Sequence, residues 1–432
     1  MMMPVTLPRE CLTERGHCFN LFVMKVVSDM RRLVTVAMAA SALTLIFVSC
    51  SGGGDTVRSV KRESLFSLGY GTLEDQIDLF RIEGMAPPLK TRITMRDGIF
   101  FLSNGNGAKV LTLSSFGDLL SMIYNPDKNP PPVVLGSPEG APKGRAAHTY
   151  PFNEPGEIAV DSNKHVYVED RLPPERRTFD SGTSTALEHV VLRFSTDGEF
   201  IDFLGQEGVG GTPFPVIIGL YVTAQDDCVV VCMTREAWIV YWFDTRGLVK
   251  STVRIRRDSL PLPDDRGLMP SLDKIYPDPD GGGIFLKVDY YSESIDPATK
   301  TRSGIHYDRA FVYRMDSSTA AYTDKYEILP FEPSKSRGDE DSPPRVWEFL
   351  GAARGRNLFF TTTDEEGNTF IAVYSGSARV LKRYSIRIDS DELQYTTLYL
   401  SPDGILCALM GTRFEARVVW WRFDRILSGG AP

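Results

Sequence analysis

The chain has 432 residues, of which 42% are hydrophobic, and it carries 48 Lys and Arg against 56 Asp and Glu, a formal net charge of −8 at pH 7. The hydrophobic fraction is ordinary for a soluble globular protein. The acidic balance argues against a nucleic-acid partner and against simple electrostatic adhesion to anionic lipid. A chain of this length usually forms two domains, although all-β folds can exceed the usual size as one unit.

The segment from residue 30 to 50 reads MRRLVTVAMAASALTLIFVSC and has the order of a secretory signal peptide. Arg31 and Arg32 precede an apolar run from Leu33 to Val48, and a small residue follows it. The run is shorter than the roughly 20 residues that cross a bilayer. A flexible Gly/Ser stretch comes next without a basic stop-transfer cluster, so we favour a cleaved signal over a transmembrane anchor.

The cysteine at the expected cleavage point resembles the lipobox of bacterial lipoproteins, although Phe47 stands where Leu is usual. The resemblance implies that Cys50 is joined to diacylglycerol and becomes the first residue of a protein tethered to a membrane outside the cytoplasm. Residues 1–29 would then be an upstream extension, 30–49 the signal peptide and 50–74 a tether. Ser51 after the lipidated cysteine gives a weak lean towards the outer membrane.

Beyond Cys50 the chain has three further cysteines, an odd number that gives no disulfide framework. In a strand, Cys228 and Cys232 would share a face but lie too far apart to bond to each other. We therefore expect these two and Cys407 to be buried thiols that act as small hydrophobes.

The remainder, residues 75–428, predicts many short strands and almost no helix. The segments are rich in β-branched and aromatic residues and are bounded by Gly, Asp, Asn, Ser or Pro, the residues that turns require. In chain order they are 98–103, 109–115, 157–162, 165–170, 189–195, 199–205, 228–234, 238–244, 283–291, 309–316, 357–363, 369–375, 379–388, 396–401, 405–411 and 416–424.

Two patterns alternate along these strands. One is a strand, a turn such as Asp97-Gly98 or Asp403-Gly404, and a second strand; the other is an aromatic-rich strand that ends in a turn, as in 239–247 and 311–319. Paired together, they give six units of about four strands each. Units of four strands repeated around an axis describe a β-propeller, so we predict an all-β, six-bladed propeller of antiparallel blades.

One unit resembles a known repeat. EPGEIAVDSNKHVYVEDR (154–171) and VVLRFSTDGEFIDFLG (190–205) resemble the NHL repeat; the unit that follows, to about residue 256, is degraded but alignable, and the other four match only in pattern. The resemblance implies an NHL-like propeller in which residues 172–188 are an insertion inside a blade. We also predict that DQIDLFRIE (75–83) is the outer strand of the last blade and closes the ring, which removes an exposed edge.

No residues for catalysis, for a cofactor or for a metal can be assigned. NHL-type propellers that act as lyases use histidines and a metal near the central channel, and the histidines of this chain do not match such a set or the spacing of a metal-binding pair. YPDPDGGG (276–283) is better interpreted as a turn than as a calcium loop. The aromatic strands 237–244 and 416–424 are interpreted as packing between blades. The four histidines after Cys50 are His148, His165, His189 and His306.

Long Pro-rich connections at 125–153 and 332–345, the second with an acidic tip at 339–341, would decorate one face of a stiff scaffold. We therefore expect a monomeric, lipid-anchored envelope protein that binds or scaffolds a protein partner. Two alternatives stay open: a metal-dependent lyase or lactonase-like hydrolase with its site in the channel, and a sensor of a glycan or small ligand.

Overall fold

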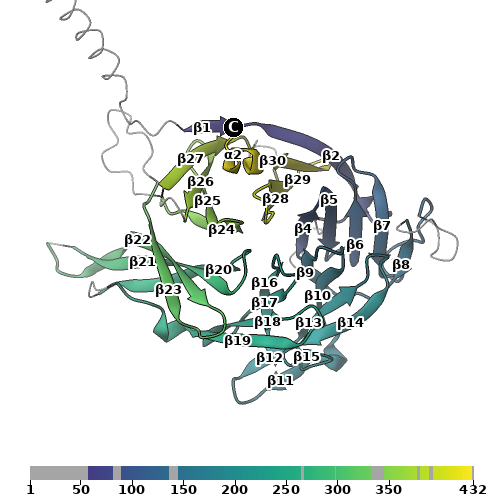
Figure 1. Ribbon diagram of the computed structural model, residues 1–432, viewed down its shortest axis with the longest axis horizontal. Coiled ribbons are helices and arrows are strands. Elements are labelled where there is room, and N and C mark those ends of the chain that lie inside the picture. The colour runs from purple at the N-terminus through teal and green to yellow at the C-terminus, as the bar shows by residue number, and fades with distance from the viewer. Residues whose placement is uncertain are drawn as a thin grey trace, which may run out of the picture. The chain divides into compact units, whose positions relative to one another are not determined.

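The computed structural model describes residues 57–80, 89–135, 145–263, 267–296, 298–331, 345–376, 380–388 and 393–430. Six antiparallel sheets are arranged in a ring, which confirms the predicted six-bladed β-propeller (Figure 1). The inner strand of each blade contacts the inner strands of both neighbouring blades, so the ring is continuous. The six inner strands are β4, β9, β16, β20, β24 and β28, with the bounds given below.

The first three blades follow one another along the chain. Blade 1 consists of β4 (Thr91–Arg96), β5 (Ile99–Asn104), β6 (Lys109–Leu113), β7 (Leu119–Tyr124) and β8 (Ala147–Thr149). Blade 2 consists of β9 (Pro155–Val160), β10 (Val166–Arg171), β13 (His189–Phe194), β14 (Phe200–Gly205) and β15 (Gly208–Val209). Blade 3 consists of β16 (Val216–Val222), β17 (Cys228–Met233), β18 (Ala237–Phe243) and β19 (Val249–Arg256).

The other three blades complete the ring. Blade 4 consists of β20 (Met269–Pro277), β21 (Gly283–Ile295), β22 (Arg302–Asp316) and β23 (Tyr322–Ile328). Blade 5 consists of β24 (Glu348–Ala353), β25 (Asn357–Thr363), β26 (Thr369–Ser375), β27 (Val380–Ile386) and β1 (Arg58–Val60). Blade 6 consists of β28 (Tyr395–Leu400), β29 (Leu406–Gly411), β30 (Ala416–Trp421), β2 (Arg62–Tyr70) and β3 (Gln76–Ile77).

Helical segments are short. The 3-10 turn η1 (Pro174–Arg176) and the hairpin of β11 (Thr178–Asp180) and β12 (Thr185–Leu187) form the predicted insertion between β10 and β13. A second 3-10 turn, η2 (Arg257–Ser259), follows β19, and α2 (Phe423–Leu427) follows β30. No helix in the described part of the chain is long and apolar enough to span a membrane.

An N-terminal strand closes the ring, as predicted, but it is not the predicted one. Strand β2 pairs antiparallel with β30, from Arg62 opposite Trp421 to Leu68 opposite Ala416. Of the segment 75–83, Gln76 and Ile77 form only the short β3, which pairs parallel with β2. The expectation that residues 58–70 belong to the tether is therefore wrong. The outer strand of a blade is half exposed, so its sequence is as polar as that of a linker.

The core is divided among the blade boundaries. A buried hydrophobic cluster lies at each of the six boundaries, and the aromatic strands supply many of its members, which confirms their interpretation as packing residues. Trp242 and Trp421 are examples from blades 3 and 6. The thiols of Cys228, Cys232 and Cys407 are buried and unpaired, as expected.

The turns between strands follow the residues that favour them. Asp97 and Gly98 connect β4 to β5 with φ of 51° and 77°. A two-residue hairpin with positive φ at both central positions has the twist that antiparallel strands need, and Asp-Gly adopts it at low cost. These tight turns lie at the end of the blades where the inner strands finish.

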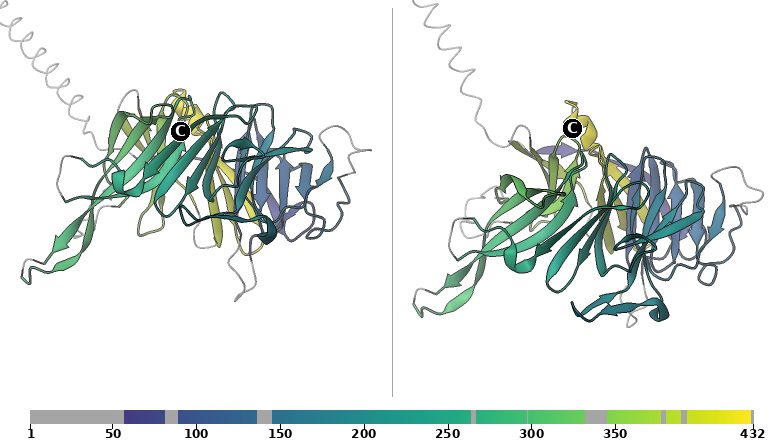
Figure 2. Two further views of the ribbon diagram at one scale, coloured as in Figure 1. Left: turned by 90° about the horizontal axis from the view of Figure 1, so that it is seen from below. Right: turned by 60° about the horizontal axis from the view of Figure 1, so that its bottom comes forward.

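Strand direction gives the propeller two different faces. Each inner strand begins at one face, which we call the insertion face, and finishes at the other, which we call the turn face. The insertion face carries the described connecting residues 71–80, 89–90, 125–135, 145–154, 172–188, 206–215, 257–263, 267–268, 329–331 and 345–347, and the turn face carries the turns 97–98, 161–165, 223–227, 278–282, 354–356 and 401–405. The β11–β12 and β21–β22 hairpins project from the side opposite α2 (Figure 2).

Candidate functional site

A cavity of about 630 Å³ lies at the centre of the insertion face, and residues from all six inner strands line it. Its volume is within the range of ordinary ligand pockets. The charged residues of its lining are Arg92 from β4, Glu157 from β9, Asp273 and Lys274 from β20, and Glu348 from β24. β28 adds Tyr395, whose hydroxyl donates to the carbonyl of Thr91 at 2.6 Å. This cavity is the candidate functional site.

β-Bulges aim residues of four successive inner strands into the cavity. Ile218 in β16, Asp273 in β20 and Leu350 in β24 are each one residue in excess of the strand that pairs with them. β9 has the same irregularity beside Glu157. All four residues line the cavity. A bulge turns a side chain away from its regular direction and is common beside binding sites, so the repetition indicates a shaped opening.

Three tyrosines form the floor of the cavity: Tyr221, Tyr276 and Tyr399. The rings of Tyr221 and Tyr276 lie 4.7 Å apart between centroids. Gly351 makes this possible, because a Cβ atom there would lie 2.5 Å from a ring carbon of Tyr276. The same tyrosines line a cavity of only about 40 Å³ on the turn-face side, so they narrow the channel between its two ends.

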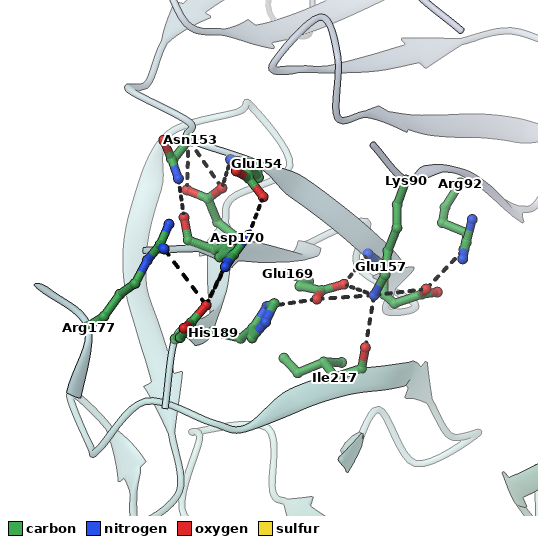
Figure 3. A network of polar contacts seen from close by, with 12 residues as sticks. Lys90, Arg92, Asn153, Glu154, Glu157, Glu169, Asp170, Arg177, His189 and Ile217 are labelled. Atoms are coloured by element: carbon green, nitrogen blue, oxygen red, sulfur yellow. Dashed lines mark hydrogen bonds and ion pairs between the residues drawn. The ribbon is translucent and has the colours of Figure 1, made fainter. Parts of the chain in front are cut away.

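A polar network connects one wall of the cavity to the interior of blade 2 (Figure 3). Arg92 donates from Nε to Oε1 of Glu157 at 2.9 Å. Lys90 lies with Nζ 3.5 Å from Glu157 and 2.8 Å from Oε2 of Glu169, and it donates to the carbonyl of Ile217 at 2.8 Å. These contacts join the first three blades at the insertion face.

Two adjacent acids of β10 have opposite electrostatic environments. Burial by itself would raise the pKa of Glu169, but His189 and Lys90 hold it below its usual range, because Nδ1 of His189 lies 3.0 Å from Glu169. Burial raises the pKa of Asp170 to about 7, and among the described residues its carboxylate accepts hydrogen bonds from the backbone N–H groups of Asn153 and Glu154 alone. The Lys90 ammonium and the neighbouring His189 therefore keep the first acid ionised, whereas burial outweighs the backbone donors at the second.

We expect Asp170→Asn to stabilise the protein above pH 7. Because the folded pKa of Asp170 is raised, its contribution to stability is complete below the unfolded value and is lost as the pH rises towards 7. The amide keeps an oxygen acceptor for the two backbone donors without the charge. Urea denaturation measures the free energy of unfolding at pH 5 and pH 8. The decrease between these two pH values should be smaller in the variant than in the wild type, by about a few kcal/mol at most. An identical drop would contradict this assignment.

The other wall of the cavity holds a second set of charges. The Asp273 carboxylate lies 3.0 Å from the buried Nζ of Lys287 and accepts from the backbone of Phe349 at 2.9 Å. Lys274 donates to the carbonyl of Leu350 at 2.7 Å, and burial lowers the pKa of its ammonium group. The exposed carboxylate of Glu348 has no hydrogen-bond or ion-pair partner among the described residues.

The four histidines do not form a site. His165 and His189 lie at opposite ends of the β10–β13 pair, and His165 contacts Asp161 with 2.8 Å between Nδ1 and Oδ2. His306 pairs with Ser292 on the β21–β22 hairpin, and His148 lines a groove between blades 1 and 2. In the described part of the chain, no three His, Cys, Asp or Glu side chains are placed to hold a metal.

Sequence reasoning did not identify the cavity residues. Glu157 and Glu348 each stand in the first half of an inner strand, and a charge at that position of a propeller unit is a usable signal, whereas Lys274 lies in the second half of β20. The bulges that direct their neighbours inward have no such signal. Cys50 and the acidic tip at 339–341 lie outside the described residues.

Comparison with known proteins gives likeness of fold alone. No protein-family profile matches the chain, and no curated protein matches it. Among solved structures, the Dos1 propeller aligns with 10% identity over 77% of this chain and 81% of its own, at a TM-score of 0.33. A protein of unknown function from Bacteroides caccae aligns with 8% identity over 77% and 87%, at 0.31, and a loop-replaced KlHsv2 with 11% over 50% and 57%, at 0.26.

Proposed function

We propose that this protein is an extracytoplasmic lipoprotein, anchored through Cys50, whose NHL-like propeller binds a protein partner of the cell envelope through its insertion face. One observation carries the binding role: the insertion 172–188, the strand ends that flank the other long connections and the wide end of the channel lie on the same face. A rigid scaffold with variable loops gathered at one end is the usual arrangement for recognition. Within the described residues, the turn face carries turns of a few residues and the short helix α2.

The β21–β22 hairpin supplies a contact surface on that face. Beyond the blade, one side of the hairpin carries Ile305 opposite Glu293 and Tyr307 opposite Tyr291. Ile295 and Ile305 are 61% and 66% exposed. The other side carries small polar residues such as Ser292 and Ser294. A projecting apolar side on a stiff two-stranded arm suits contact with another protein better than contact with water.

The membrane anchor rests on the sequence of residues 30–50. A tether followed by a propeller would hold the insertion face near envelope partners, and we propose that the protein is a monomer. Ser51 after the lipidated cysteine weakly favours the outer membrane. The ring leaves the binding face free, because the N-terminal segment enters along β1 and β2 at the outer edges of blades 5 and 6.

Lipidation is tested by Cys50→Ala. We expect the wild type to incorporate a fatty-acid probe, to migrate as a processed form and to sediment with membranes. The variant should remain unprocessed and unlabelled, because the thiol is the site of attachment. Ser51→Ala is the matched control and should behave as wild type. Equal labelling of the wild type and Cys50→Ala would overturn the anchor.

The protein-binding role is tested by shortening the β21–β22 hairpin. Replacing residues 293–305 with a two-residue turn closes the hairpin on the Ser292–His306 pair and keeps the part that pairs within the blade. We expect crosslinking in intact cells, followed by capture and mass spectrometry, to lose a recurrent partner in this variant. Exchange of Phe116, an exposed residue in the β6–β7 turn on the turn face, for Ser is the control. A partner retained at the wild-type level would contradict the role of the hairpin.

A further inference from the structure

We propose that the cavity of the insertion face binds a small zwitterion, a free amino acid or short peptide, with the ligand carboxylate at Lys274 and the ligand ammonium at Glu348. This site is separate from the protein contact proposed above and needs no partner. The proposal follows from which charges of the cavity are already neutralised and which are not.

Three of the five charges that line the cavity have an ion-pair partner within the protein. Arg92 and Glu157 pair with each other at 2.9 Å. Asp273 lies 3.0 Å from the fully buried ammonium of Lys287, which also holds Asp289 at 2.7 Å. These contacts shape the walls, and a ligand that competed for them would have to break existing ion pairs.

The two remaining charges have opposite signs. Lys274 uses one of its three N–H groups on the carbonyl of Leu350, and no carboxylate lies within ion-pair distance of it among the described residues. Glu348 accepts no hydrogen bond within that same part of the chain. They do not pair with each other, and both line the cavity. A ligand that carries a carboxylate and an ammonium group would satisfy both.

The positions of these groups give the ligand a direction. Lys274 is half-buried towards the tyrosine floor and lies 5.8 Å from the ring centroid of Tyr276, whereas Glu348 is exposed at the opening. A carboxylate would therefore enter first and an ammonium would remain nearer to solvent. A dianion would be repelled by Glu348, and a dication by Lys274, so single-sign ligands are disfavoured.

The site predicts a particular pH dependence. Burial lowers the pKa of Lys274, and a carboxylate binds only its protonated form. The affinity for the ligand is therefore highest below this lowered pKa and decreases as the pH rises through it. The decrease begins at a lower pH than it would with a lysine of ordinary pKa. Lys274→Arg keeps the charge of the protein at all these pH values, so the variant should show only the fall in affinity that comes from deprotonation of the ligand's own ammonium group.

Titration calorimetry on the full-length protein in detergent, with alanine and Ala-Ala as probes, tests the proposal. We expect at least one probe to bind. Its N-acetylated and C-amidated forms should bind with an affinity lower by about tenfold or more, and so should the unmodified probe to the variants Glu348→Gln and Lys274→Met. Glu175→Gln, an exposed acid outside the cavity, should bind as wild type. Since Glu348 is exposed, its variant is expected to fold normally, and its melting temperature checks this.

The outcomes separate the ligand sources. Tighter binding of alanine identifies a free amino acid, and tighter binding of Ala-Ala identifies a short peptide. The proposal is overturned if neither probe binds at millimolar concentration, if the blocked forms bind as well as the free ones, or if Glu348→Gln binds unchanged. None of these results would alter the partner capture described above, so the two proposals fail independently.

Discussion

Replacement of Glu169 by alanine is expected to lower the free energy of unfolding by about 3–5 kcal/mol, the usual cost of removing one partner from a buried ion pair. The Glu169 side chain is 2% exposed, contacts Lys90 and His189, and accepts from the backbone of Glu157 at 2.8 Å. Without this carboxylate, the ammonium of Lys90 keeps only Glu157 at 3.5 Å and one carbonyl. Blades 1, 2 and 3 lose a shared contact in one change.

Urea denaturation at pH 7 measures this loss, with Glu175→Ala as the exposed control. The pH dependence gives a second readout. Because the folded pKa of Glu169 is lowered, its contribution is present above the ordinary glutamate range and is lost as the pH falls through the folded value. The difference in free energy of unfolding between the wild type and the variant should therefore become smaller at acidic pH. A difference in free energy of unfolding below about 1 kcal/mol at pH 7 would show that the network does not stabilise the contact between the blades.

Loss of the closing strand is expected to have the largest effect of all. Deletion of residues 57–70 removes β1 from blade 5 and β2 from blade 6, and it exposes the edge of β30. Val60 and Leu68, both buried in blade-boundary clusters, are removed with it. Removal of one buried leucine side chain costs about 2–5 kcal/mol, and the deletion also removes the hydrogen bonds between β2 and β30. The loss in free energy of unfolding should therefore approach the whole stability of an ordinary domain.

The point variant Leu68→Ala makes the same test on a folded protein. We expect a loss of about 2–5 kcal/mol, because the side chain is buried. Leu73→Ala is the matched control: its side chain is 51% exposed, so the expected change is within about 0.5 kcal/mol. If residues 57–70 were a free tether, the deletion and Leu68→Ala would both be neutral, and circular dichroism melting would show no difference.

The repeats made the architecture predictable, and the details of closure and of the cavity did not follow from them. Turn pairs such as Asp97-Gly98 mark where strands end, and alternating aromatics mark the blade boundaries, so six units could be counted. Strand β2 could not be recognised from the sequence because it is only partly buried. It contains Arg, Glu and Ser, and polar segments of this composition are also typical of linkers. Local pattern cannot decide between the two when the partner strand is more than 300 residues away.

The cavity depends on single-residue irregularities. Ile218, Asp273 and Leu350 line it because each is an extra residue in its strand, and a one-residue shift reverses the side on which every following side chain lies. Regular alternation along β16 or β20 therefore predicts the wrong face for these positions. The shared location of Lys274 and Glu348 needs the closed ring, since they belong to different blades.

The central claim is that recognition takes place on the insertion face, and site-specific photo-crosslinking in living cells tests it most directly. A photoreactive amino acid is placed at Ile295 or Ile305 on the insertion face, and at Asp197 or Asp403 on the turn face. The account predicts discrete crosslinked species from the first pair, absent from the second. Crosslinks of equal strength from the turn face, or from that face alone, would contradict it.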